Sequence, residues 1–167
     1  SQTVAAVADA VNLPGIPFEV AERATDKITM RQVLQEKGVP VPQFRSVWTL
    51  DEGREALNSM TLPLVIKPCD NMGARGVRKI ERPDDLIPAF REAKEASISG
   101  KLVVEEFMEG PELSLDALVY DNEIFITGVA DRIIEHSPYF VEVGHTLPSS
   151  LPEKKVKKTL EVFKQAI

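Results

Sequence analysis

The stretch PLVIKPCDNMGARGVRKIER (63–82) decides the fold. Residues 63–68 form a short run that is too apolar to be an exposed edge strand. Residues 69–76 have the glycine and polar content of a loop, and residues 77–82 again have the composition of a strand. The segment therefore predicts a hairpin of two strands with a long, glycine-containing tip.

Lys67 stands at the end of the apolar strand, where packing alone would not favour a cation. Two readings follow: the side chain snorkels to solvent, or it is a fixed cation for a phosphate or carboxylate. Gly73 and Gly76 favour the second reading, because positive φ angles let backbone amides approach an anion closely. A plain turn stays the alternative, since the loop is neither a P-loop nor a dinucleotide fingerprint.

A second group of polar residues lies in VVEEFMEGPELSLDAL (103–118). Strand alternation puts Glu105 and Glu106 on opposite faces, so one of them needs a partner if the strand is half buried. A carboxylate there can accept from an exocyclic amine such as that of adenine, and the bend at residues 110–111 would present Glu112 to a diol. The alternative is a surface acid pair on an edge strand.

The rest of the chain alternates helices with mostly antiparallel strand pairs, which predicts an α+β fold of two small lobes. One helix begins at a cap on Thr25 or Asp26 and ends at Gly38. Residues 136–151 are expected to be irregular. The other helices are expected over 4–12, 51–60, 83–97 and 152–167, and the other strands over 44–49, 102–108, 112–120 and 123–135.

Composition excludes several functional classes. The 167 residues carry 20 Lys+Arg and 26 Asp+Glu, a formal net charge of −6, and no long basic run, so a nucleic-acid partner is not expected. A single cysteine, Cys69, fits a reducing compartment. No apolar stretch reaches the ~18–20 residues of a membrane span, and the first residues lack the basic-then-apolar order of a signal peptide. We expect a cytoplasmic protein without a membrane partner, cut from a longer chain.

Four segments follow one another in the chain: DKITMRQVLQEKGVPVP (26–42), PLVIKP (63–68), the glycine loop and EEFMEGPE (105–112). This ordered set resembles the ATP-grasp superfamily, and among its members the carboxylate–amine ligases grouped with carbamoyl-phosphate synthase, biotin carboxylase, purine-pathway ligases and L-amino acid ligases. The resemblance implies an α+β ATP-grasp fold of two lobes with antiparallel sheets. It assigns residues 1–24 to the tail of a preceding domain, 25–106 to the small lobe, and 107–167 to the first part of a second lobe whose last part is missing.

The resemblance also implies an ATP site. Lys27 and Lys67 match the two nucleotide-contacting lysines of the family, the second reaching the α- and β-phosphates. Glu112 matches the acid that binds the ribose. The flap over the phosphates is matched by the loop containing Asn71, Gly73, Ala74 and Gly76. The adenine contacts are matched by Glu105, by the backbone of Glu106 to Met108, and by Phe107 and Met108 around the ring.

Two catalytic candidates lie further on. Arg132 stands where relatives often place a basic residue toward the γ-phosphate or acyl phosphate, and His145 lies in a stretch similar to the substrate side of amino-acid ligases. A structural role is the alternative for each. Relatives bind Mg²⁺ through an acidic residue and a Glu-x-Asn pair, which this chain lacks, so no metal ligand is assigned here and the ligands are expected beyond Ile167.

The function implied by the resemblance is transfer of the ATP γ-phosphoryl group to a carboxylate, giving an acyl phosphate that an amine or related nucleophile attacks. The expected cofactors are ATP and Mg²⁺, and the expected partners are a small carboxylate and an amine, with a homodimer left open. By itself this stretch of chain is expected to be inactive. The alternatives are a non-catalytic nucleotide-binding or assembly module and a purely structural α+β domain.

Overall fold

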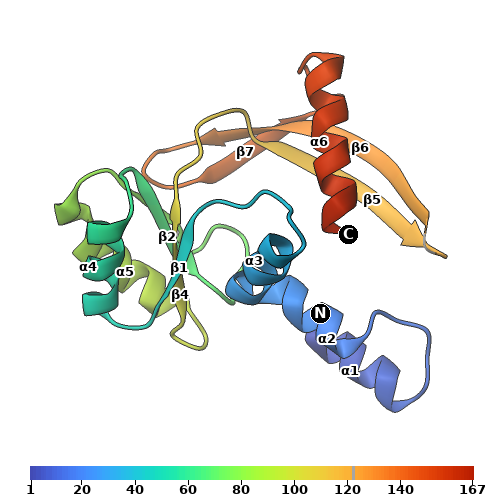
Figure 1. The fold of residues 1–167 in the computed structure, drawn as a ribbon, viewed down its shortest axis with the longest axis horizontal. Coiled ribbons are helices and arrows are strands. Elements are labelled where there is room, and N and C mark those ends of the chain that lie inside the picture. The colour runs from blue at the N-terminus through green and yellow to red at the C-terminus, as the bar shows by residue number, and fades with distance from the viewer. Residues whose placement is uncertain (122) are drawn as a thin grey trace. The chain divides into compact units, whose positions relative to one another are not determined.

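The computed structural model describes residues 1–121 and 123–167. The chain divides into two compact units, Ser1–Phe107 and Met108–Ile167, each with its own antiparallel sheet (Figure 1). The predicted α+β class with two antiparallel sheets is therefore confirmed.

The sheet of the first unit has four strands in the order β1-β4-β2-β3. These are β1 (Phe44–Val47), β4 (Leu102–Glu106), β2 (Leu64–Pro68) and β3 (Arg78–Ile80), and all three neighbouring pairs are antiparallel. β2 and β3 form the hairpin predicted from residues 63–82. β4 lies between β1 and β2, which places Glu105 inside the sheet rather than on an edge strand.

One face of this sheet is covered by α4 (Leu50–Ser59) and α5 (Leu86–Ala96). Thr49 begins α4 with a reciprocal capping box to Glu52. The predicted helix 83–97 differs at its start, because Pro83–Asp85 form a 3₁₀ turn and α5 begins only at Leu86. The main core between sheet and helices consists of Val47, Ala56, Leu64, Ile66, Ile80, Leu86, Ala89, Ala93, Leu102 and Val104.

The opposite face of the sheet packs against α3 (Lys27–Glu36), because strand alternation points Val103 away from the main core. A small cluster of Ile28, Cys69, Val103 and Phe44 joins this helix to the strands. Asp26 is the N-cap of α3, where its side chain accepts from the Thr29 amide at 2.8 Å. The packing of α3 brings its first residue, Lys27, to the end of β2.

Two shorter helices precede α3. α1 (Gln2–Ala10) coincides with the predicted helix 4–12 apart from its ends, whereas α2 (Phe18–Thr25) lies outside the helices expected from the sequence. Pro17 stands at the N-cap of α2. Within the described parts of the chain, no helix is long and apolar enough to cross a membrane.

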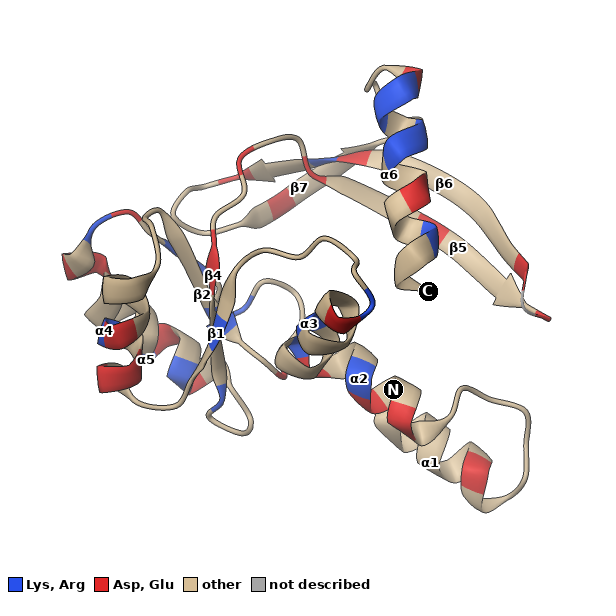
Figure 2. Cartoon of the chain, viewed as in Figure 1, with Lys and Arg blue, Asp and Glu red and all other residues tan. Residues whose placement is uncertain are grey.

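The second unit is built on β5 (Leu113–Tyr120), β6 (Glu123–Glu135) and β7 (Val141–Thr146), followed by α6 (Glu153–Ala166). The strands pair in the order β5-β6-β7. The prediction that residues 136–151 are irregular is wrong for β7, because its pairing with β6 makes a strand that local composition does not indicate. The first two turns of α6 carry a run of basic residues (Figure 2): Lys154, Lys155, Lys157 and Lys158.

Candidate functional site

Glu105 is the one charged side chain among the described residues that is buried, with an exposure of 4%. Its Oε1 lies 3.0 Å from Nε of Arg31, and its Oε2 lies 2.5 Å from Nζ of Lys67. Burial alone would raise the pKa of Glu105, but the two cations outweigh burial and hold the pKa below its usual value. The carboxylate is therefore ionised at neutral pH and has two partners.

Lys67 is a fixed cation. Its side chain is only 17% exposed and is held by Glu105, so the reading in which it snorkels to solvent is wrong. Cross-strand pairing of Lys67 with Val103 and of Val65 with Glu105 places the lysine and the glutamate on the same face of the sheet, the face that carries α3.

Lys27 lies close to this pair. Its Nζ donates to the carbonyl of Asn71 at 2.6 Å and to that of Cys69 at 3.4 Å. Burial lowers the pKa of Lys27, and repulsion from Lys67 lowers it further. An anion bound beside the two ammonium groups would relieve this repulsion, which is the electrostatic property expected of a phosphate site.

The loop after β2 is anchored at both ends. At its start, Asn71 Nδ2 donates to the carbonyl of Ala96 at 2.7 Å. At its end, Gly76 has φ +68°, and a Cβ built there would lie 2.7 Å from Cβ of Ala96. Between them, Gly73 and Ala74 also have positive φ angles, of 72° and 56°. Met72 is 81% exposed, so the tip of the loop faces solvent.

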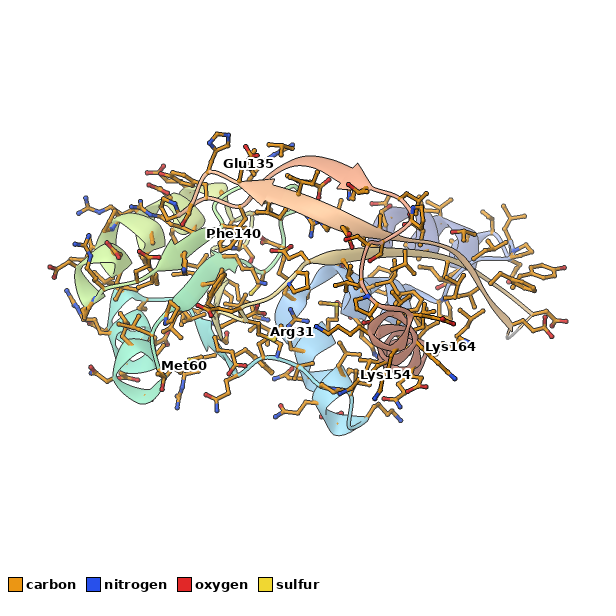
Figure 3. The ribbon with its side chains drawn as sticks, turned by 90° about the horizontal axis from the view of Figure 1, so that it is seen from above. Arg31, Met60, Glu135, Phe140, Lys154 and Lys164 are labelled. Carbon is orange, nitrogen blue, oxygen red and sulfur yellow. The ribbon has the colours of Figure 1, made fainter. Side chains whose placement is uncertain are left out.

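Two cations on the face of the sheet that carries α3, Arg31 and Lys79, are not among the site residues predicted from the sequence. Arg31 lies on α3 (Figure 3). It follows Lys27 by four residues, a spacing that puts both on one side of the helix. Lys79 pairs with Val65 across the hairpin, so alternation puts it on the same face as Lys67. Its Nζ lies 4.2 Å from the ring centroid of Phe107. Helical spacing and strand register were the signals that could have found both.

The residues predicted to contact adenine continue from the end of β4. The Glu106 amide donates to the carbonyl of Gln43 at 3.0 Å, and the Phe107 amide donates to that of Pro63 at 3.1 Å. Met108, the first residue of the second unit, is 64% exposed. These bonds fix the backbone of residues 106 and 107, and the adenine role stays a prediction.

The second unit brings together the other three predicted residues. Arg132 Nη1 lies 3.2 Å from Oε2 of Glu112, and the Arg132 guanidinium also binds Glu142. His145 pairs with Arg132 across β6 and β7, and its Nε2 lies 3.5 Å from Oε1 of Glu142. Glu142 therefore links Arg132 to His145. The sequence reading misses Glu142, because it treats residues 136–151 as irregular.

His145 also lines a hollow on the second sheet. The other lining residues are Ser114, Asp116, Thr127, Gly128, Ala130 and Leu147. Across residues 1–121 and 123–167, no three His, Cys, Asp or Glu side chains come together in a way that could hold a metal ion.

Comparison with known proteins identifies the family. Residues 60–167 match the model of the ATP-grasp domain. This chain belongs to the ATP-grasp domain family. The ATP-grasp chain is 26% identical to the alanine–anticapsin ligase of Bacillus subtilis (strain 168), over 98% of this chain and 39% of the ligase.

Solved structures share the fold of this ATP-grasp chain. The L-amino acid ligase from Bacillus licheniformis matches it with a TM-score of 0.84 and 26% identity, over 99% of this chain and 38% of the ligase. The biotin carboxylase domain of 2-oxoglutarate carboxylase from Hydrogenobacter thermophilus, solved in complex with MgADP, ADP and bicarbonate, matches with a TM-score of 0.83 at 18% identity, over 99% of this chain and 39% of that one.

These matches confirm the predicted superfamily and the ATP-grasp fold. They also relate the ATP-grasp chain to ligases, because two of the three proteins are named as such. The chain spans 34% of the length of one curated relative and 39% of another.

Proposed function

We propose that this chain is the ATP-binding part of an ATP-grasp ligase. The observation that supports the proposal is the cluster of Lys27, Lys67 and Arg31 around the single carboxylate of Glu105. The cluster carries more positive than negative charge, and the mutual repulsion of its lysines is relieved by a bound polyanion. The triphosphate of ATP supplies that charge.

In this proposal Lys27 and Lys67 bind the phosphates, and the loop from Asn71 to Gly76 covers them. The backbone at the end of β4, from Glu106 to Met108, binds the adenine ring, and Glu112 binds the ribose. The carboxylate of Glu105, which the resemblance assigned to adenine, instead holds Lys67 and Arg31. Closure of the loop tip would exclude water from a reactive intermediate. The domain limits 1–24, 25–106 and 107–167 belong to the same proposal.

The proposed reaction of the parent protein has two steps. A substrate carboxylate oxygen attacks the γ-phosphorus of ATP, ADP leaves, and an acyl phosphate forms. An amine then attacks the acyl carbon, so that inorganic phosphate leaves and the nitrogen loses a proton. Arg132 is the proposed cation for the transferred phosphoryl or acyl phosphate, and His145 is proposed to act on the substrate side. Positioning and neutralisation of charge supply most of the catalysis in reactions of this kind.

The magnesium ligands expected from the resemblance are not found among the described residues, where no three His, Cys, Asp or Glu side chains could hold a metal ion. The proposal places the magnesium ligands of the parent protein outside these 167 residues.

Titration calorimetry with MgATP tests the binding proposal. We expect Lys67→Ala and Glu112→Ala each to lose affinity by about tenfold or more, because each removes a charged contact to the nucleotide. Lys37→Ala, at an exposed position after α3, is the matched control and should bind like the unmodified chain. Unchanged affinity in both site variants would reject the site assignment. Failure of MgATP to bind or to raise the melting temperature would favour a purely structural domain.

A second experiment separates a ligase from a non-catalytic module. ADP release by the full-length parent protein is measured with and without a carboxylate and an amine, using a panel of amino acids for both. We expect ADP release to depend on the added substrates. If no member of a broad panel stimulates release while MgATP binds, the alternative of a nucleotide-binding or assembly module is favoured.

A further inference from the structure

The carboxylate of Glu105 is shared by two cations from different elements. Lys67 comes from β2 and binds Oε2, while Arg31 comes from α3 and binds Oε1. The side chains of Lys67 and Arg31 are 17% and 20% exposed, so both pairs are largely shielded from water. The third cation of the cluster, Lys27, interacts electrostatically with both Lys67 and Glu105 and donates its own hydrogen bonds to loop carbonyls.

This arrangement creates a competition for Lys67. Its ammonium lies 2.5 Å from Glu105, and a lysine held this closely by a carboxylate must give up or share that pair to bind a phosphate fully. Were Lys67 the sole partner, its departure would leave a buried carboxylate without a cation, and a protein interior strongly disfavours such an unpaired charge. Arg31, the second cation, keeps the carboxylate of Glu105 paired when Lys67 leaves it.

We infer that Arg31 is a positioning residue that frees Lys67 for the nucleotide, because Arg31 retains Glu105 when Lys67 exchanges its carboxylate partner for a phosphate. The inference rests on the proposed function. This role follows from the contact between Arg31 and Glu105 and needs no direct contact between Arg31 and the nucleotide. A guanidinium suits this role, since it remains charged at every physiological pH.

A double-mutant cycle on MgATP affinity tests the inference, using the whole chain. We expect Arg31→Met to weaken binding by about tenfold or more, because Lys67 then remains bound to Glu105. In a Glu105→Gln background no carboxylate competes for Lys67, so adding Arg31→Met should change affinity by about twofold or less. Arg31→Lys should recover part of the loss. Arg54→Met removes an exposed arginine on α4 that pairs with Asp51, and it should bind like the unmodified chain.

Proton uptake during binding is the second readout, and a merely structural role would not change it. Without Arg31, transfer of Lys67 to a phosphate leaves Glu105 buried with no cation in direct contact, which raises its pKa in the complex. Binding by Arg31→Met should therefore take up more protons near pH 6 than binding by the unmodified chain, measured by calorimetry in buffers of different ionisation enthalpy. Affinity of this variant should fall as pH rises.

The outcomes separate the two proposals. If the unmodified chain binds no MgATP, the proposed function falls and this inference falls with it. If it binds, but Arg31→Met costs the same in both backgrounds, Arg31 acts as a direct cation for the nucleotide and only the inference is overturned. Equal proton uptake by the variant and the unmodified chain overturns it as well. Circular dichroism and the fluorescence of Trp48 verify that each variant is folded before it is compared.

Discussion

Gly76 gives the sharpest test of how the phosphate-side loop is built. Two energetic costs oppose a side chain at position 76, one from the backbone conformation and one from steric overlap. Its φ of +68° costs an L-residue about 1 kcal/mol relative to glycine. In addition, a Cβ would lie 2.7 Å from Cβ of Ala96 and 3.1 Å from Cα of Ala93, and overpacking of this kind costs about 1–3 kcal/mol. Gly76→Ala should therefore lower the free energy of unfolding by about 2–4 kcal/mol.

Gly73 is the matched control, because it shares the backbone cost of Gly76 but not its steric cost. It has nearly the same φ, +72°, but nothing lies within 4 Å of the position of its Cβ. Gly73→Ala should therefore cost about 1 kcal/mol, the backbone term alone. The comparison isolates the close approach of the loop to α5.

Urea unfolding measures both variants. Trp48 is the single tryptophan of the chain and lies in the first unit, so its fluorescence reports on the unit that contains the loop. Equal losses for Gly73→Ala and Gly76→Ala, within about 0.5 kcal/mol, would refute the tight packing of the loop end against α5. A larger loss for Gly73→Ala would refute the account of the loop tip as well.

Three further predictions concern other parts of the chain. The pKa of Glu105 is depressed in the folded state, so its stabilising effect is present above the ordinary glutamate pKa of about 4.3 and is lost as pH falls through the folded pKa. Because Glu105→Gln removes this titration, the unfolding free energy of the variant should decline less steeply between about pH 5 and 3. An unchanged slope would contradict this. Burial raises the pKa of the Cys69 thiol to about 11, so iodoacetamide at neutral pH should label it no faster than the first unit unfolds, whereas labelling at the rate of a free thiol would exclude its burial. Asp131 accepts from the Ser150 amide at 2.8 Å, so Asp131→Ala should speed hydrogen exchange at that amide by about tenfold, and unchanged exchange would show that the bond does not protect it.

The hairpin of residues 63–82 was predictable because the residues that determine it lie within the hairpin itself. The apolar run before Lys67 and the two glycines determine two strands and a loop without reference to distant residues. The same holds for α3, where the Asp26 cap and the terminating Gly38 are readable directly. The alternation of Glu105 and Glu106 correctly predicted that one glutamate is inside and has a partner.

The features that sequence did not reveal depend on distant contacts. β7 is a strand because it pairs with β6, and its own six residues include a glycine and lie in a segment rich in proline and serine. The partner of Glu105 on α3 lies 74 positions away along the chain, and no local pattern joins the two. Glu142 was missed for the same reason, since its place beside Arg132 follows from the pairing of β6 with β7.

The position of β4 affects how this protein is made. β1 and β2 are synthesised first, but they do not contact each other as neighbours in the sheet, because β4 pairs with both of them. A nascent chain that ends before Leu102 exposes two unsatisfied strand edges and an apolar surface on each, which are the features that promote aggregation. The lysines of α3 and β2 are thus made early in translation but reach their places only when the ribosome has released the segment that contains Glu105. Folding of the first unit is therefore expected to wait for this last strand.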